Sequence, residues 1–225
     1  MSEIIYPSIT SVMSSGGSLS NVQNLLIFSA EAAHKLRALI GWNRFDYPPN
    51  RNEMGGWLIG RYIRDDNGQI VQAEVTDILK AESCEGTPTY LEWPAIEDIR
   101  LQREFFRIKE ELTLIHPEAG EALTRIGWWH THPNSLPVFM SSTDMSTQHL
   151  KYFKPHDYSV VLNPHRLIWR AFVGKDAVEV PAIMLIDSYT PKPKKTVSLK
   201  AKHKSGWNKR KKIKRLKREK KMARR

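Results

Sequence analysis

The sequence predicts a mixed α/β fold in which helices flank a twisted, largely antiparallel sheet. Strand-like and helix-like segments are intermixed along the chain. One pair of apolar segments is joined by Asp66-Asn67-Gly68, a turn typical of a hairpin between antiparallel strands. The chain has 225 residues, of which 40% are hydrophobic, and this is enough for one domain of ordinary size with a real core.

Charge divides the chain into two unequal parts. Residues 191–225 contain eighteen Lys and Arg and only one acid, Glu219, a net charge of +17. The first 190 residues hold the other 17 bases and 23 acids, a net of −6, although the whole chain carries +11. This asymmetry predicts a boundary near Pro191. We expect a flexible Ser- and Gly-rich leader over residues 1–22, a single domain over 23–190, and a disordered basic tail over 191–225.

Local signals support each element of the N-terminal half. Residues 25–28 form a short apolar run that predicts a strand, and Ser29 is a suitable N-cap for a helix that continues to residue 40. The glycine-rich segment 54–63 predicts a strand, and residues 70–79 return from the hairpin turn as its partner.

The C-terminal half reads in the same way. Residues 94–115 predict a long helix, residues 123–129 a strand, and residues 141–153 a second helix that begins at Ser141. Three short strands complete the predicted domain: 158–162, 167–172 and 178–186.

Two histidines follow directly after the predicted strand 123–129. His130 and His132 are separated by one residue, and residues i and i+2 of an extended backbone point to the same face. Both imidazoles can therefore be directed at one point, as a shared metal ion requires. An isolated His-x-His is more often packing or surface decoration, so the prediction depends on further ligands.

Asp144 supplies a third, anionic ligand if the intervening loop folds back. Ser141 lies three residues before it at the predicted start of a helix, so the two side chains are neighbours. Two histidines, a carboxylate and an open fourth position are typical of a catalytic zinc site, whereas closed structural sites are rich in cysteine. Such a site needs a general base, and Glu53, at the start of the strand with Gly55, is the candidate.

This set of residues resembles the JAMM (JAB1/MPN/Mov34, MPN-plus) metalloproteases. The resemblance covers roughly residues 25–187 and rests on Glu53, His130-x-His132-Pro133 and Ser141-x-x-Asp144 in this order, with Gly-Trp-Trp before His130. Eight residues separate His132 from Ser141, where many members have seven, and this difference concerns the shape of the loop.

The resemblance implies a cytidine-deaminase-like JAB/MPN architecture and a set of roles. His130, His132 and Asp144 would bind Zn²⁺, Glu53 would transfer the proton, and Ser141 would hydrogen-bond the oxyanion. Family members with the complete set cleave isopeptide or peptide bonds after the C-terminal tail of ubiquitin-like proteins. A compact single domain is compatible with a stand-alone, prokaryotic member, for example in a ubiquitin-like conjugation or antiphage defence operon. A protease of sulfur-carrier metabolism would share the site and differ in substrate.

The basic tail supports a second hypothesis from another class. A nucleic-acid-associated protein would act through residues 191–225, whose charge attracts phosphates regardless of sequence, and would use the JAB fold as a scaffold or DNA-repair-linked module. An acidic protein, an anionic membrane surface or a purely solubilising role are the other interpretations of the tail.

The remaining features receive ordinary interpretations. The single cysteine, Cys84, excludes an internal disulfide framework and fits a cytoplasmic protein, and no signal peptide or transmembrane segment is evident. Trp57, Trp128 and Trp129 are interpreted as core and cleft wall. His149 is interpreted as a surface or core histidine, with a place beside the metal ligands as the alternative.

Overall fold

The computed structural model describes residues 3–5, 22–42 and 51–186. Contacts between residues divide the chain into two units, Met1–Ser188 and Tyr189–Arg225, and the described residues all belong to the first. The predicted tail and most of the predicted leader lie outside the described residues. Residues 3–5 of that leader form a strand.

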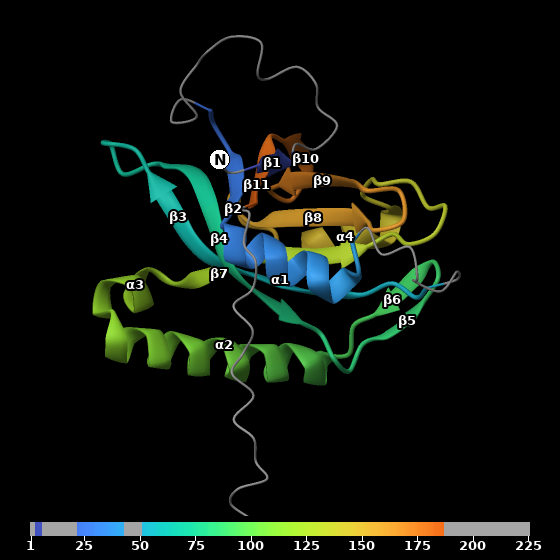
Figure 1. Cartoon of the computed structure of the whole chain (residues 1–225), viewed down its shortest axis with the longest axis horizontal. Coiled ribbons are helices and arrows are strands. Elements are labelled where there is room, and N and C mark those ends of the chain that lie inside the picture. The colour runs from blue at the N-terminus through green and yellow to red at the C-terminus, as the bar shows by residue number, and fades with distance from the viewer. Residues whose placement is uncertain (1–2, 6–21, 43–50, 187–225) are drawn as a thin grey trace, which may run out of the picture. The chain divides into compact units, whose positions relative to one another are not determined.

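Within the described residues, nine strands form one mixed sheet, and two further strands, β5 and β6, form a separate hairpin (Figure 1). The sheet order is β1-β11-β2-β4-β3-β7-β8-β9-β10. The strands of this sheet are β1 (Glu3–Ile5), β2 (Leu25–Phe28), β3 (Gly55–Arg64), β4 (Ile70–Lys80), β7 (Thr124–Thr131), β8 (Tyr158–Asn163), β9 (Ile168–Val173), β10 (Val178–Val180) and β11 (Ala182–Ile186). Among these described strands, five neighbouring pairs are antiparallel and three are parallel, so the predicted mixed, largely antiparallel sheet is confirmed.

The predicted final strand is wrong in one respect, because Pro181 divides it into β10 and β11. β10 pairs with β9 at one end of the sheet order, whereas β11 pairs with β2 near the other end. One residue joins these two strands, so the sheet has to curl until its two ends approach each other. The curled sheet encloses the larger part of the hydrophobic core.

Two helices cover opposite faces of the sheet. They are α1 (Ala30–Ile40) and α2 (Ala95–Ile115). Leu58 of β3 packs in the core cluster with Leu36 of α1, whereas its neighbours Trp57 and Ile59 pack in a second cluster with Leu101 of α2. Adjacent residues of a strand point to opposite faces, so each helix is assigned to its own side.

Helix α1 has the capping that its sequence predicts. The Ser29 side chain accepts a hydrogen bond from the amide of Ala32 at 3.2 Å, and Gly41 ends the helix in the left-handed conformation with φ of 64°. These interactions satisfy terminal backbone groups that would otherwise lack partners.

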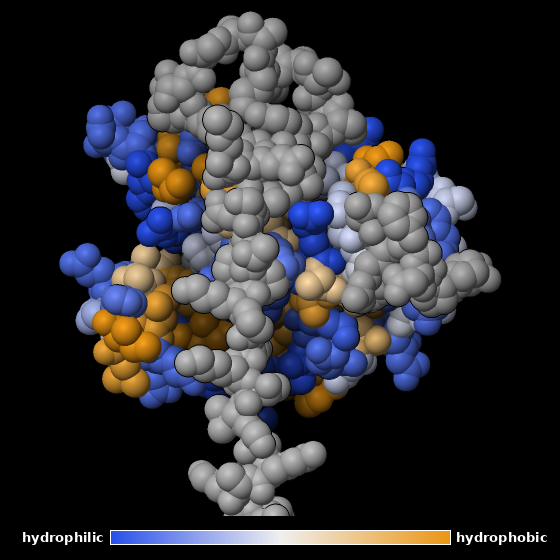
Figure 2. Space-filling model, viewed as in Figure 1, coloured by the Kyte–Doolittle hydropathy of each residue, from blue (hydrophilic) through white to orange (hydrophobic). Residues whose placement is uncertain are grey.

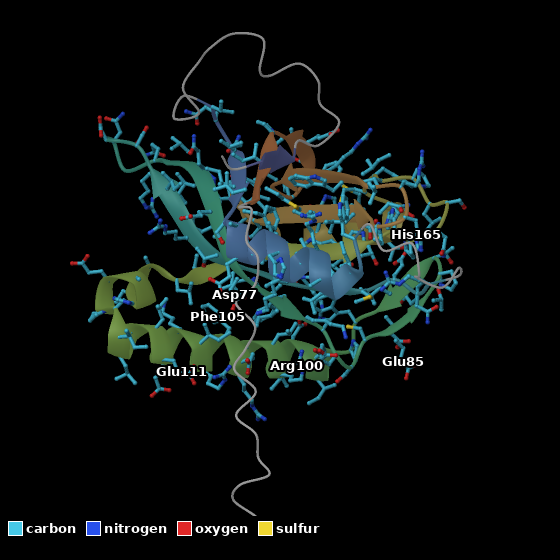
Figure 3. The ribbon with its side chains drawn as sticks, in the orientation of Figure 1. Asp77, Glu85, Arg100, Phe105, Glu111 and His165 are labelled. Atoms are coloured by element: carbon cyan, nitrogen blue, oxygen red, sulfur yellow. The ribbon has the colours of Figure 1, made fainter. Side chains whose placement is uncertain are left out.

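Helix α2 packs less completely than α1. Phe105 extends toward the sheet and Glu111 extends away from it (Figure 3). Leu114 and Ile115 at its C-terminal end, just before α3 (Pro117–Ala122), are exposed. Figure 2 shows a hydrophobic area at the side of the molecule where α2 meets α3. None of the helices within residues 22–42 and 51–186 is long and apolar enough to cross a membrane.

Four short elements of the described residues differ from the prediction: β1, which lies in the expected leader, α3, and the hairpin strands β5 (Glu85–Thr87) and β6 (Tyr90–Glu92). The last helix, α4 (Ser142–Lys151), follows Ser141 as expected but ends before residue 153. The hairpin and α4 border the predicted site from two directions.

Candidate metal centre

The structure brings His130, His132 and Asp144 together as a buried group that could hold a metal ion. The Nε2 atoms of the two histidines are 3.1 Å apart. Asp144 Oδ1 lies 3.1 Å from Nε2 of His130, and Oδ2 lies 3.4 Å from Nε2 of His132. Two ligands at 2.0–2.1 Å from a tetrahedral zinc ion are separated by about 3.3 Å, so the three donors fit one ion of this kind.

Strand β7 positions the first histidine. It pairs with β3 on one side and β8 on the other, and His130 lies opposite Gly55 and Val161. The register of the β3–β7 pair shifts beside Ile126, where one residue of β7 has no partner. Such a bulge changes which side chains share a face. Arg125 thereby lies on the same side of β7 as Trp128 and His130, and contacts rings on that side.

His132 lies just after β7 and is held at both its backbone and its ring. Its amide donates to the carbonyl of Leu162 at 2.8 Å, which continues the ladder with β8. Its Nδ1 lies 2.8 Å from the carbonyl oxygen of Pro137. A proton on Nδ1 therefore leaves Nε2 available as a ligand, the arrangement usual for metal-binding histidines.

Asp144 is fixed by the capping box of α4. The Ser141 hydroxyl oxygen accepts from the Asp144 amide at 3.2 Å, and the Ser141 amide donates to Asp144 Oδ2 at 2.7 Å. A capping box pairs two otherwise unsatisfied amides at the start of a helix. The same hydrogen bonds orient the Asp144 carboxylate toward the two histidines, so the cap of α4 also sets the geometry of this ligand.

The electrostatics of the three residues suit a cation. Burial lowers the pKa of His130 and favours its neutral form, although the hydrogen bond to Asp144 opposes this effect. Burial also acts on Asp144, but hydrogen bonds from both histidines outweigh it and hold the pKa of the carboxyl below its usual range. For His132, the bonds to Asp144 and Pro137 outweigh burial and raise its pKa. An anionic carboxylate beside imidazoles is the donor set that zinc prefers.

Glu53 lies at the same pocket, on a segment held by the β5–β6 hairpin. Its amide donates to the carbonyl of Thr87 at 2.8 Å. Gly86 packs so closely that a Cβ atom there would lie 2.2 Å from the Glu53 carbonyl oxygen. Glu53 as a whole is 8% exposed. Burial raises its pKa to about 7, with His132 opposing and Asp144 reinforcing the shift.

A pocket of about 230 Å³ opens over His130, His132 and Asp144, which we call the metal group. Besides Glu53, Ser141 and the three ligand residues, its lining comes from the hairpin, from the loop between β7 and α4, and from the first turns of α4. The other lining residues are Thr89, Tyr90, Leu91, Trp93, Trp128, Leu136, Phe139, Thr143 and Thr147. All five residues predicted for the site therefore border one pocket.

Two anchors join the hairpin to the body. At its entry, the buried carboxylate of Glu97 accepts from the amides of Glu82 and Ser83 at 2.8 and 3.1 Å. At its exit, the Trp93 indole N–H donates to Asp98 Oδ1 at 2.8 Å, and Asp98 also pairs with Lys151 of α4. The sequence predicts none of these contacts, because acidic side chains near the start of a helix are usually exposed to solvent.

The structure also places the residues to which the sequence analysis gave no catalytic or metal-binding role. Trp57 and Trp129 are buried in the core, and Trp128 is buried and lines the pocket. His149 is exposed on α4 and does not border the pocket. Burial and the nearby Glu97 raise the pKa of Cys84 to about 12, so its thiol stays protonated and is a poor nucleophile.

Comparison with known proteins adds no further assignment. No protein-family model matches the chain, and no curated protein matches it significantly. The functional argument therefore rests on the sequence pattern, the fold class and the donor geometry.

Proposed function

We propose that this protein is a zinc-dependent peptidase of the JAMM type, which cleaves isopeptide or peptide bonds after the C-terminal tail of a ubiquitin-like protein. The observation that carries the proposal is the buried group of two imidazoles and one carboxylate, 3.1–3.4 Å apart, with Glu53 lining the same pocket. The order of the matching residues in the sequence supports the family assignment, and a single cysteine supports a cytoplasmic location.

His130, His132 and Asp144 would hold the zinc ion. When bound, zinc acts as a Lewis acid and lowers the pKa of water toward ~7. Glu53 would take a proton on its carboxylate and return it to the leaving amine. A base works best when its pKa is near the working pH. Burial raises the pKa of Glu53 to about 7 in the metal-free fold, and a bound zinc ion would lower it from that value.

Ser141 has a second hydrogen-bonding function available. Its hydroxyl oxygen already accepts from the Asp144 amide, but its hydroxyl proton is not needed by the cap. Because Ser141 also lines the pocket, that proton can be donated to oxygen of the carbonyl under attack. One donor of this kind can contribute about 3 kcal/mol of transition-state stabilisation.

The size of the pocket bears on the class of substrate. A pocket of about 230 Å³ would take a narrow segment of chain and not a folded surface. A modifier with a flexible C-terminal tail meets this requirement. The tail would lie beside the β5–β6 hairpin, where a strand can add to an exposed edge. The sulfur-carrier alternative would present a similar tail to the same residues.

Zinc content and peptidase activity test the proposal together. We expect about one zinc per purified chain by elemental analysis, and none in the double variant His130→Ala/His132→Ala. A panel of ubiquitin-like proteins with a fluorogenic amide at the C-terminus should show hydrolysis that stops with a chelator and returns with zinc. A folded wild-type chain that takes up no zinc would contradict the whole proposal, whereas zinc without hydrolysis would contradict only the reaction.

The charge of residues 191–225 favours the second candidate, a nucleic-acid-associated protein. Its +17 would give binding to phosphates that weakens steeply with salt. Deletion of residues 191–225 separates the two functions. A peptidase keeps hydrolysis of small tail substrates, whereas a protein that acts through nucleic acid loses its main activity. The same binding measurement with an acidic protein or an anionic vesicle in place of nucleic acid tests the other partners proposed for the tail.

A further inference from the structure

The His130 ring lacks the hydrogen bond that usually orients a metal-binding histidine. A ligand histidine normally donates its second ring N–H to a carboxylate, a carbonyl or water, and this bond fixes the plane of the ring. His132 has such a partner in Pro137. His130 Nδ1 is buried, and no described residue offers it a hydrogen bond. Something else must therefore fix the plane of this imidazole.

Trp128 lies against the face of that imidazole. The two ring centroids are 4.5 Å apart and the planes differ by only 11°. Both residues belong to β7 at positions i and i+2, so the stack follows from the strand itself. Contact with Asp144 fixes the direction of Nε2 within the plane, while the indole face limits rotation of the plane.

Gln148 holds the indole in turn. The Trp128 N–H donates to Gln148 Oε1 at 2.7 Å. The Gln148 amide nitrogen donates to the carbonyls of Tyr152 and Gly174 at 2.9 and 3.0 Å, which fixes the orientation of the amide. Gln148 is completely buried, so these bonds are shielded from water.

Helix α4 therefore acts on the metal group in two places. Asp144 and Gln148 are four residues apart and lie on the same face of the helix. Asp144 reaches the histidines directly, and Gln148 reaches His130 through Trp128. Tyr152 stacks on Trp128 as well, with centroids 5.5 Å apart, and continues the same face.

We propose that Trp128 and Gln148 are positioning residues that fix the plane of the His130 imidazole and thereby set the zinc affinity of the site. This inference rests only on the metal-binding part of the proposed function. It does not depend on the substrate or on the reaction.

The test measures zinc affinity by competition with a chromogenic chelator in four single variants and one double variant of the full chain. Trp128→Leu removes the stack and should weaken zinc binding by about 10–100-fold, the range known for residues that orient metal ligands. Trp128→Phe keeps a flat ring and should recover most of that loss. Trp169→Phe is the control, because Trp169 is equally buried but packs against Phe28 in the core. Its zinc affinity should stay at the wild-type value.

The fourth variant, Gln148→Met, separates positioning from general stability. It should weaken zinc binding several-fold in the wild-type chain and leave it unchanged in the Trp128→Phe background, where no indole N–H remains to be held. A Gln148 effect of equal size in both backgrounds would contradict a route through Trp128. Melting of the metal-free proteins shows how much each variant destabilises the fold on its own.

Fluorescence supplies an independent readout. Zinc binding should change tryptophan emission in the wild type and in Trp169→Phe, and this change should be lost in Trp128→Phe. A folded Trp128→Leu protein with zinc affinity within about two-fold of wild type would overturn the proposal. If Trp128→Leu binds zinc more weakly and the wild type binds zinc but has no peptidase activity, the inference is supported and only the proposed reaction is rejected.

Discussion

The two walls of the pocket are built in different ways. The ligand wall, formed by β7 and α4, carries His130, His132 and Asp144, all buried and each fixed by strand pairing or by the capping box. The hairpin wall, formed by the Glu53 segment with β5 and β6, has strands of three residues and largely exposed side chains, among them Glu85 (Figure 3). In the proposed function, metal binding and proton transfer would depend on separate parts of the fold, so substitutions should affect them separately.

The largest effect is expected on the ligand wall. Asp144→Ala removes one ligand and one half of the capping box, so both zinc and activity should be lost. Asp144→Asn is the matched variant, because its amide oxygen can still accept from the Ser141 amide. It should keep helix α4 while binding zinc weakly. Unchanged zinc stoichiometry in Asp144→Ala would remove Asp144 from the ligand set.

Glu53→Gln should separate the contributions of the two walls most clearly, because it should lower turnover and leave zinc binding intact. Glutamine is nearly the same size as glutamate but cannot accept a proton, so kcat should fall by about 10²–10⁴-fold. Zinc content should stay near one per chain, since the ligand wall is untouched. The measurement is kcat beside elemental analysis of the same sample. Full activity would show that Glu53 is not the base.

Ser141→Ala tests a residue that serves both the cap and the proposed reaction. Loss of the cap should cost about 1 kcal/mol of stability. Loss of an oxyanion donor should lower kcat by about 10²–10³-fold. Ser29→Ala is the control, because Ser29 caps α1 in the same way and lies outside the pocket lining. Equal kcat in the two variants would restrict Ser141 to its structural role.

Gly86→Ala should displace the base without touching the ligand wall. The new methyl group would meet the Glu53 carbonyl oxygen at 2.2 Å, so the backbone has to move. A displacement of about 1 Å can cost about 10²-fold in rate, and zinc should be retained. Gly68→Ala is the control: it strains a turn with φ of 78° but has open space around it. It should lower the melting temperature and leave kcat unchanged.

The smallest effect concerns pH. Glu53 has an ordinary pKa of 4.5 when unfolded and about 7 in the metal-free fold. Between these values the folded chain binds more protons than the unfolded one, so this residue makes stability fall as pH rises from 4.5 to 7. The shift corresponds to at most about 3–4 kcal/mol, and partial screening by solvent reduces this to about 2–3 kcal/mol. Denaturant unfolding of the metal-free protein should show a free energy of unfolding that falls with pH, and the slope should be smaller in Glu53→Gln. Identical slopes in the two proteins would contradict the raised pKa of Glu53.

The sequence predicts the ligand wall better than the hairpin wall, for a physical reason. The histidine spacing, the cap at Ser141 and the boundaries of β2, α1, β3 and β4 depend on local periodicity and on residues close together in the chain. Gly86 beside Glu53 and Gln148 beside Trp128 are contacts between distant segments, and no local pattern marks them. Short strands such as β5 and β6 lack room for a periodic signal.

The same distinction explains the remaining differences. Glu97 looks like a surface acid at the start of a helix, yet it is buried and binds the backbone at the hairpin entry. Pro181 lies within an apolar run, and its effect on the sheet depends on which strands are neighbours. Because proline has no backbone N–H to donate to a neighbouring strand, the sequence marks Pro181 as a break between strands. The pairing of β10 with β9 and of β11 with β2 follows only from the completed sheet.

The parallel pairing of β11 with β2 has a consequence for how the chain folds. β2 is among the first strands to be synthesised, and β11 contains the last described residues of the sheet. Until residues 182–186 are available, β2 has one unpaired edge and the curled core beneath it is open. Contacts between such distant segments slow folding and leave an edge that can associate with other chains. A nascent chain that stops before Ala182 should therefore be prone to aggregate, although every residue of the metal group is already present.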